Sequence, residues 1–95
     1  MIKEQMTQKN WFDNLKPTKH FIERYYERIF ERYLHKNFDH ENETDKIFSD
    51  MNQRLLDREK TFIKLFVGNK NKILLPIGAH YQIVIKNKVL ITVLS

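Results

Sequence analysis

Three basic side chains spaced four residues apart are the group in this sequence best suited to chemistry. His20, Arg24 and Arg28 recur at intervals of four, so a helix would place them along one flank. An imidazole can move a proton near neutral pH, and a guanidinium offers fixed, paired donors to a phosphate. The spacing fits two interpretations: a metal-free site for phosphodiester chemistry, or a surface histidine beside a solvated ladder of Glu and Arg.

The C-terminal third adds three further candidates. Thr92 interrupts the apolar run 89–94, where a hydroxyl either donates to a phosphate or simply fills a strand position. His80 and Tyr81 are adjacent, so in a strand they point to opposite faces and only one can enter a given cleft. His80 could act as a second acid–base group, and Tyr81 could either stack on a base or belong to the core.

The charge distribution favours a polyanionic partner. The chain has a formal net charge of +5, yet all 12 acidic residues precede position 60. From Gly68 onward the only charged residues apart from a histidine are lysines, at positions 70, 72, 86 and 88. Such a surface attracts nucleic acid by neutralising phosphates, and Lys86 and Lys88 are the candidate contacts. The other interpretation is that these lysines only prevent strand edges from aggregating.

Several functional classes are excluded by composition. The 95 residues include no cysteine, which rules out a disulfide scaffold, a thiolate zinc site and a cysteine nucleophile, and makes a reducing cytoplasm the expected location. The polar loop with His35 and His40 fixes no ligand geometry, so we expect neither a metal nor another cofactor. No apolar stretch approaches the ~20 residues of a membrane-spanning helix, and the N-terminus lacks the apolar run of a secretion signal.

Two helices are predicted in the first 60 residues. The first runs from an N-cap at Thr18 to Lys36, because apolar residues recur at helical spacing. Its predicted buried stripe consists of Ile22, Tyr25, Tyr26, Ile29, Phe30 and Tyr33. The second helix begins at an N-cap at Asn42 or Thr44 and reaches about Arg58–Lys60. Its apolar stripe consists of Ile47, Phe48, Met51, Leu55 and Leu56.

Four strands are predicted in the remainder, at 61–67, 73–77, 80–85 and 89–94. They are rich in β-branched and aromatic residues, and the short polar turn 86–88 makes the last two a hairpin. The order α-α-β-β-β-β predicts an α+β fold with two N-terminal helices packed on a four-stranded, mainly antiparallel sheet. Residues 1–95 then form a single domain, with 1–15 as an N-terminal arm.

Two motifs carry a resemblance to a known family. One is the pattern Thr-Lys-His-x-x-Glu-Arg-x-x-Glu-Arg at 18–28, and the other is the terminal hairpin with Gly78, Tyr81 and Thr92. Over residues 18–34 and 78–95 the chain resembles small phage- and plasmid-borne proteins of the RelE-type, barnase/EndoU-like ribonuclease superfamily. The resemblance implies that the protein cleaves RNA without a metal ion, by attack of the RNA's own 2′-hydroxyl on the adjacent phosphate. It implies catalytic roles for His20, Arg24 and Thr92, with Arg28 as a phosphate contact.

The sequence therefore predicts a small metal-independent ribonuclease or RNA-binding protein, with catalysis itself left open. The predicted RNA-contacting residues are Arg28, Tyr81, His80, Lys86 and Lys88. Expected partners are RNA and a host protein or cognate antitoxin, in the cytoplasm of the host cell if the chain is phage-encoded. The alternative is a non-enzymatic phage or mobile-element protein that binds and inhibits a host protein complex, with Trp11 and Phe12 as anchors. The oligomeric state stays open.

Overall fold

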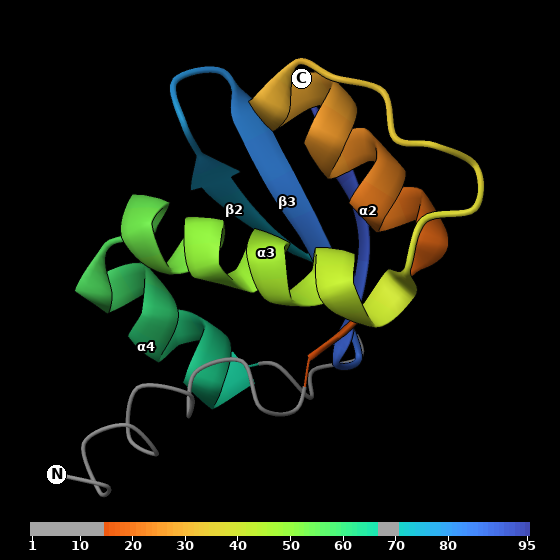
Figure 1. Ribbon diagram of the computed structural model, residues 1–95. Helices are drawn as coiled ribbons and strands as arrows, with labels where there is room; N and C mark the ends of the chain where they lie inside the picture. Colours follow the sequence, from red (N-terminus) through yellow and green to blue (C-terminus); the bar gives the residue numbers. More distant parts are fainter. Residues whose placement is uncertain (1–14, 67–70) are drawn as a thin grey trace, which may run out of the picture.

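A sheet forms one layer of the structure and helices form the other (Figure 1). The computed structural model describes residues 15–66 and 71–95, so Trp11 and Phe12 lie outside the described residues. The sheet has the strand order β1-β4-β3-β2, with β2, β3 and β4 antiparallel and β1 parallel to β4. Its strands are β1 (Lys16–Pro17), β2 (Ile73–Ile77), β3 (Tyr81–Lys86) and β4 (Val89–Leu94). The predicted α+β class and four-stranded sheet are confirmed.

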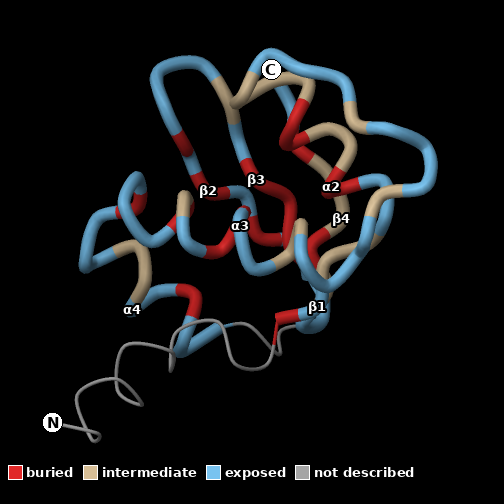
Figure 2. Tube along the Cα trace, viewed as in Figure 1, coloured by how far each residue is buried: buried red, intermediate tan, exposed pale blue. Residues whose placement is uncertain are grey.

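The helices pack on one face of this sheet. Figure 1 shows α2 and α3 on the same side, with α3 crossing in front of β2 and β3. The core lies between the two layers, where residues of both become buried (Figure 2). The helical segments are α2 (Lys19–Tyr25), a π-helical turn η1 (Tyr26–Phe30), α3 (His40–Arg54) and α4 (Asp57–Phe66).

The strands alternate between this inner face and an outer face. In β2, Ile73, Leu75 and Ile77 are buried, whereas Leu74 and Pro76 are exposed. Successive side chains of a strand point to opposite faces, and residues paired on neighbouring strands lie on the same face of the sheet. The outer face thus consists of Lys16, Leu74, Pro76, Gln82, Val84, Lys86, Val89, Thr92 and Leu94.

The first helix begins where the sequence predicts but ends earlier. Thr18 is its N-cap, and the Thr18 side chain accepts a hydrogen bond from the Phe21 backbone N–H. The helix stops at Glu31, which has left-handed backbone angles (φ 58°, ψ 44°), so the prediction to Lys36 is wrong. The π turn before it adds one residue per turn and rotates later side chains off the helical stripe. Tyr33, predicted to be buried, lies beyond the end of the helix and is 86% exposed.

The second predicted helix is two helices. The N-cap of α3 is Asp39, three residues before the predicted Asn42, because the Asp39 carboxylate accepts from the N–H groups of residues 41 and 42. The chain then breaks at Leu55, and α4 occupies 61–66, where a strand was predicted. A local start signal explains this result: the Glu59 carboxylate accepts from the Leu56 N–H at 2.8 Å, as in a capping box. The fourth strand is β1 instead.

The C-terminal hairpin is confirmed and contains two special features. Asn87 (φ 51°) and Lys88 (φ 69°) both have positive φ, as a two-residue type I′ turn requires. Farther along, Ile85 pairs with Leu90 but Val84 pairs with Thr92. Ile91 is therefore the extra residue of a β-bulge in β4.

Candidate functional site

His20 and Arg24 lie on a side of α2 that does not enter the core. The buried residues of α2 are Phe21, Ile22 and Tyr25, whereas His20 is exposed. The Arg24 guanidinium donates to the Glu27 carboxylate, and the Arg24 side chain is 38% exposed. The two catalytic candidates on α2 thus share a surface, but the charge of Arg24 is already paired.

Thr92 lies on the outer face of the sheet. It pairs with Val84, whereas the next residue, Val93, pairs with Ile83, and both Val93 and Ile83 are fully buried in the core beneath the helices. Alternation therefore directs the Thr92 hydroxyl away from α2. The sheet separates Thr92 from His20 and Arg24, so the three catalytic candidates are not brought together in one pocket.

Arg28 lies in η1 and is half-buried. Its Nε atom is shielded from solvent and has no hydrogen-bond partner among the described residues. A ligand cannot reach that nitrogen in this conformation. Any phosphate contact by Arg28 would therefore fall to its terminal guanidinium nitrogens.

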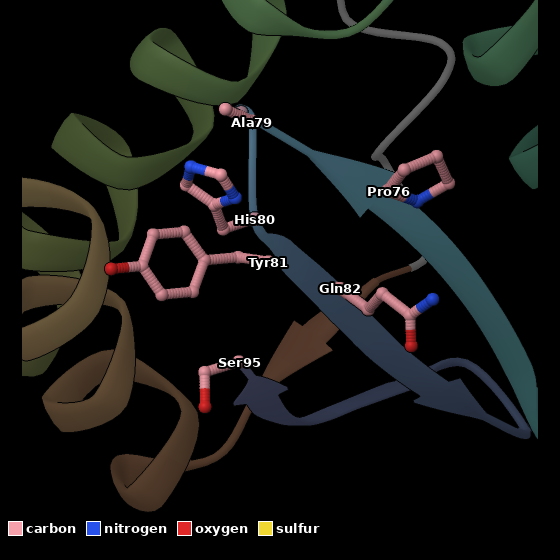
Figure 3. Close-up of a pocket in the computed structure, with 7 residues that line it drawn as sticks. Pro76, Ala79, His80, Tyr81, Gln82 and Ser95 are labelled. Carbon is pink, nitrogen blue, oxygen red and sulfur yellow. The ribbon is translucent and has the colours of Figure 1, made fainter.

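His80 and Tyr81 border an open pocket of about 340 Å³ at the turn between β2 and β3 (Figure 3). Figure 3 shows the Tyr81 ring pointing toward the helices, with Pro76 and Gln82 on the other side of the strands. Tyr81 packs against the core, which was the alternative interpretation of this residue. The lining residues are Pro76, Gly78, Ala79, His80, Tyr81, Gln82 and Ser95, with no lysine or arginine among them. A phosphate would find no cation there.

The opposite end of the sheet gathers lysines. Lys86 pairs with Val89, and Val89 pairs with Lys16, so the two lysines stand in one row of the outer face. Neighbouring strands lie ~4.8 Å apart, which puts their Cα atoms about 10 Å from each other. Lys88 occupies the adjoining turn, and its carbonyl accepts from the Lys16 N–H at 2.9 Å. We call Lys16, Lys86 and Lys88 the lysine cluster.

Only part of the lysine cluster could be found in the sequence. Lys86 and Lys88 were predicted as contacts, and the structure brings them together. Lys16 was missed, because its place depends on a parallel pairing between β1 and a strand more than 70 residues away. Of the other predicted contacts, Tyr81 begins β3, about 17 Å from Lys86 at ~3.4 Å per residue, and His80 immediately precedes the strand.

Charge is segregated between the two layers. Within the described residues, every carboxylate side chain falls between Glu23 and Glu59, on the helices and their connections. The strands and their turns contribute Lys16, Lys86 and Lys88, and Lys72 immediately precedes β2. The sheet side is therefore basic without local compensation, which favours binding of an anionic partner.

Two tyrosine–carboxylate hydrogen bonds, which sequence reasoning missed, connect the first helix to α3. The Tyr25 hydroxyl donates to Asp50 Oδ2 at 2.6 Å, and the Tyr26 hydroxyl donates to Glu43. Burial, reinforced by the bond to Asp50, raises the pKa of Tyr25 well above its usual value. Burial and the bond to Glu43 raise the pKa of Tyr26 to about 12. Both phenols are neutral donors at physiological pH and hold the helical layer together.

The described parts of the chain contain neither a grouped set of metal ligands nor a helix suited to span a membrane. Between residues 15 and 66 and between 71 and 95, no three His, Cys, Asp or Glu side chains are grouped so that they could hold a metal ion. In the same ranges, no helix combines the length and apolar character needed to cross a membrane.

Comparison with known proteins identifies no relative. No protein-family model, no curated protein and no solved structure matches this chain.

Proposed function

We propose that this protein binds RNA through the sugar–phosphate backbone, using the lysine cluster of the outer face. One observation supports the proposal above all: Lys16 and Lys86 stand in a single row beside Lys88, on a side of the sheet that has no carboxylate among the described residues. Lysine ammonium groups neutralise phosphates and release condensed counterions, which supplies the affinity.

RNA binding by the outer face should depend little on the RNA sequence. The described part of this face contains no aromatic side chain on which a base could stack. Thr92 offers a hydroxyl in the middle row of this face and Gln82 an amide in the row farthest from the lysine cluster, while Leu74 and Val84 are apolar. Contacts to phosphate and sugar therefore dominate, and these contacts do not distinguish sequences.

Cleavage is not part of the proposal. A 2′-hydroxyl attack needs an acid–base group and a phosphate-stabilising group at the same phosphodiester. His20 and Arg24 lie on the helical layer, and Thr92 lies on the outer face. The lysine cluster has no histidine within it, so it can hold RNA without reacting with it.

The test is binding of a fluorescently labelled single-stranded RNA, followed by anisotropy. The double variant Lys16→Gln/Lys86→Gln should bind about 30-fold more weakly, since each of the two lost charged contacts costs ~1 kcal/mol. The matched control is Lys60→Gln/Lys64→Gln on α4, which removes the same charge from the helical layer. Equal losses in the two variants would contradict a defined surface. A preference for DNA of the same sequence would contradict RNA as the ligand.

A second candidate function is binding to a host protein, and the exposed apolar side of α4 favours it. Ile63 is the buried residue of this helix, whereas Phe62, Leu65 and Phe66 are 40%, 71% and 43% exposed. The rings of Phe62 and Phe66 contact each other in a tilted arrangement, with centroids 4.7 Å apart. A purified 1:1 complex with a host protein that Leu65→Glu abolishes and Arg58→Glu preserves would support this alternative.

A further inference from the structure

A second pocket, of about 290 Å³, lies in the helical layer between η1 and α3. Its lining residues are Tyr26, Phe30, Arg32 and Lys46. The Tyr26 and Phe30 rings meet edge to face, with centroids 4.8 Å apart, and form its aromatic part. The two remaining residues are both cations, so the pocket combines an apolar wall with two positive charges.

The backbone at the end of η1 fixes Arg32 at this pocket. Glu31 takes a left-handed conformation, which is strained for a residue other than glycine. The N–H groups of Glu31 and Arg32 both donate to the Tyr26 carbonyl, the latter at 3.0 Å. Arg32 is thereby anchored to the same residue whose ring lines the pocket, and the anchoring is independent of the rest of the loop.

The charges at the pocket do not cancel. Glu43, one turn before Lys46 on α3, accepts from the Tyr26 hydroxyl and lies 3.7 Å from the Lys46 ammonium. That carboxylate, only 13% exposed, is therefore engaged by two partners. Arg32 has no carboxylate within 4.0 Å among the described residues. Its guanidinium is the charge left without compensation.

We infer that this pocket binds the phosphate group of a small phosphate monoester, with Arg32 and Lys46 as the phosphate-binding residues. A guanidinium donates two parallel hydrogen bonds to phosphate oxygens, and an ammonium from a second element can take a third oxygen of the tetrahedral group. Arg32 and Lys46 are both exposed, so a phosphate can reach their charged groups from solvent. The volume of about 290 Å³ accommodates the phosphate group, and the rest of the ester can extend out of the open pocket.

The pocket is independent of the proposed RNA surface. It lies among the helices, whereas the lysine cluster lies on the outer face of the sheet. A protein that failed to bind RNA could still bind phosphate here. The variants below therefore separate the two proposals.

Isothermal titration calorimetry at constant ionic strength tests this inference, with inorganic phosphate, adenosine monophosphate and adenosine as probes. Both phosphate-containing probes should bind and adenosine should not. If inorganic phosphate bound as tightly as the nucleotide, the site would recognise phosphate alone, which contradicts a monoester as the ligand. Tighter binding of the nucleotide would support the monoester. Failure of both to bind would overturn the inference.

Variants locate the binding. Arg32→Gln and Lys46→Gln should each weaken phosphate binding about tenfold, as loss of a charge-assisted hydrogen bond predicts. Arg58→Gln, a charge-matched change on α4, should leave it unchanged, and so should Lys16→Gln/Lys86→Gln. Unaltered circular dichroism spectra would show that the variants remain folded. Retention of full affinity in Arg32→Gln, or its loss in the sheet variant, would contradict the inference.

Discussion

The Thr18 hydroxyl oxygen lies 3.2 Å from the carbonyl oxygen of Ile91, the bulged residue of β4. The same oxygen accepts from the Phe21 N–H at 3.0 Å and lies 3.2 Å from the Leu90 carbonyl oxygen. The Thr18 N–H donates to Leu90 as well, at 3.1 Å. One residue thus starts α2 and fixes that helix to the strand beneath it.

Replacing this hydroxyl should weaken the whole fold. Thr18→Ala removes a helix cap and a tertiary hydrogen bond, so the free energy of unfolding should fall by about 2 kcal/mol. Urea denaturation measures the loss. Thr18→Ser keeps the hydroxyl and should recover most of the stability. If the serine variant were as unstable as the alanine variant, the hydroxyl would not be the stabilising group.

A change in the hairpin turn should separate stability from RNA affinity. Lys88 has a φ of 69°, which glycine adopts without strain. Lys88→Gly should therefore raise the free energy of unfolding by about 1 kcal/mol while weakening RNA binding. Lys88→Ala removes the same charge but keeps the strained conformation, so it should weaken binding without the gain in stability. Equal stability of the two variants would contradict the assigned turn.

The salt dependence of RNA binding should report the number of phosphates contacted. For single strands, the slope of log affinity against log salt is about −0.7 for each phosphate neutralised. Lys16→Gln/Lys86→Gln should make the slope shallower by about 1.4. Anisotropy titrations at several potassium chloride concentrations measure it. A slope identical to that of the unmodified protein would mean that these lysines do not contact phosphate.

Alkaline pH should destabilise the protein through its two buried phenols. The pKa values of Tyr25 and Tyr26 are raised in the folded state, so their contribution is fully present below the unfolded value near 10 and is lost as pH rises above it. The midpoint of thermal unfolding should fall from about pH 10 upward. Tyr25→Phe/Tyr26→Phe should be less stable at neutral pH and show a shallower decline. An equally steep decline in that variant would assign the effect to other groups.

The attachment of α4 depends on a single side chain. Ile63 is fully buried, whereas Leu65, two residues later, is 71% exposed. Ile63→Ala should cost roughly 2–5 kcal/mol and accelerate hydrogen exchange in α4 more than in β3. Leu65→Ala should leave exchange unchanged. Uniform acceleration across the molecule would show that α4 does not open separately from the core.

Local signals predicted much of the fold. Thr18 after Pro17 indicated the first N-cap, and the short apolar segment 73–77 and the hairpin at 80–94 indicated the three long strands. These features depend on neighbouring residues, so the sequence contains them directly. The segment 61–66 was wrongly predicted because its β-branched and aromatic residues outweighed the start signal formed by Leu56 and Glu59.

The site was less predictable than the fold. Helical spacing correctly placed His20 and Arg24 on one side of α2, but no local pattern could show that the Thr92 hydroxyl faces the other side of the sheet. That face is set by the one-residue bulge at Ile91, which reverses the alternation counted from Val89. Arg32 falls within the helix predicted to run to Lys36, and the left-handed Glu31 ends the helix before it.

The pairing of β1 with β4 also bears on biosynthesis. Lys16 and Pro17 pair as a strand with Val89 and Leu90, and the start of α2 is held by the same strand. Before this hairpin emerges from the ribosome, the nascent chain lacks β4, the strand between β1 and β3. It also lacks the strand that supports the start of α2. Contacts so distant in sequence form slowly and late. The protein should therefore acquire its native structure only after synthesis has passed the final strand, as one cooperative event.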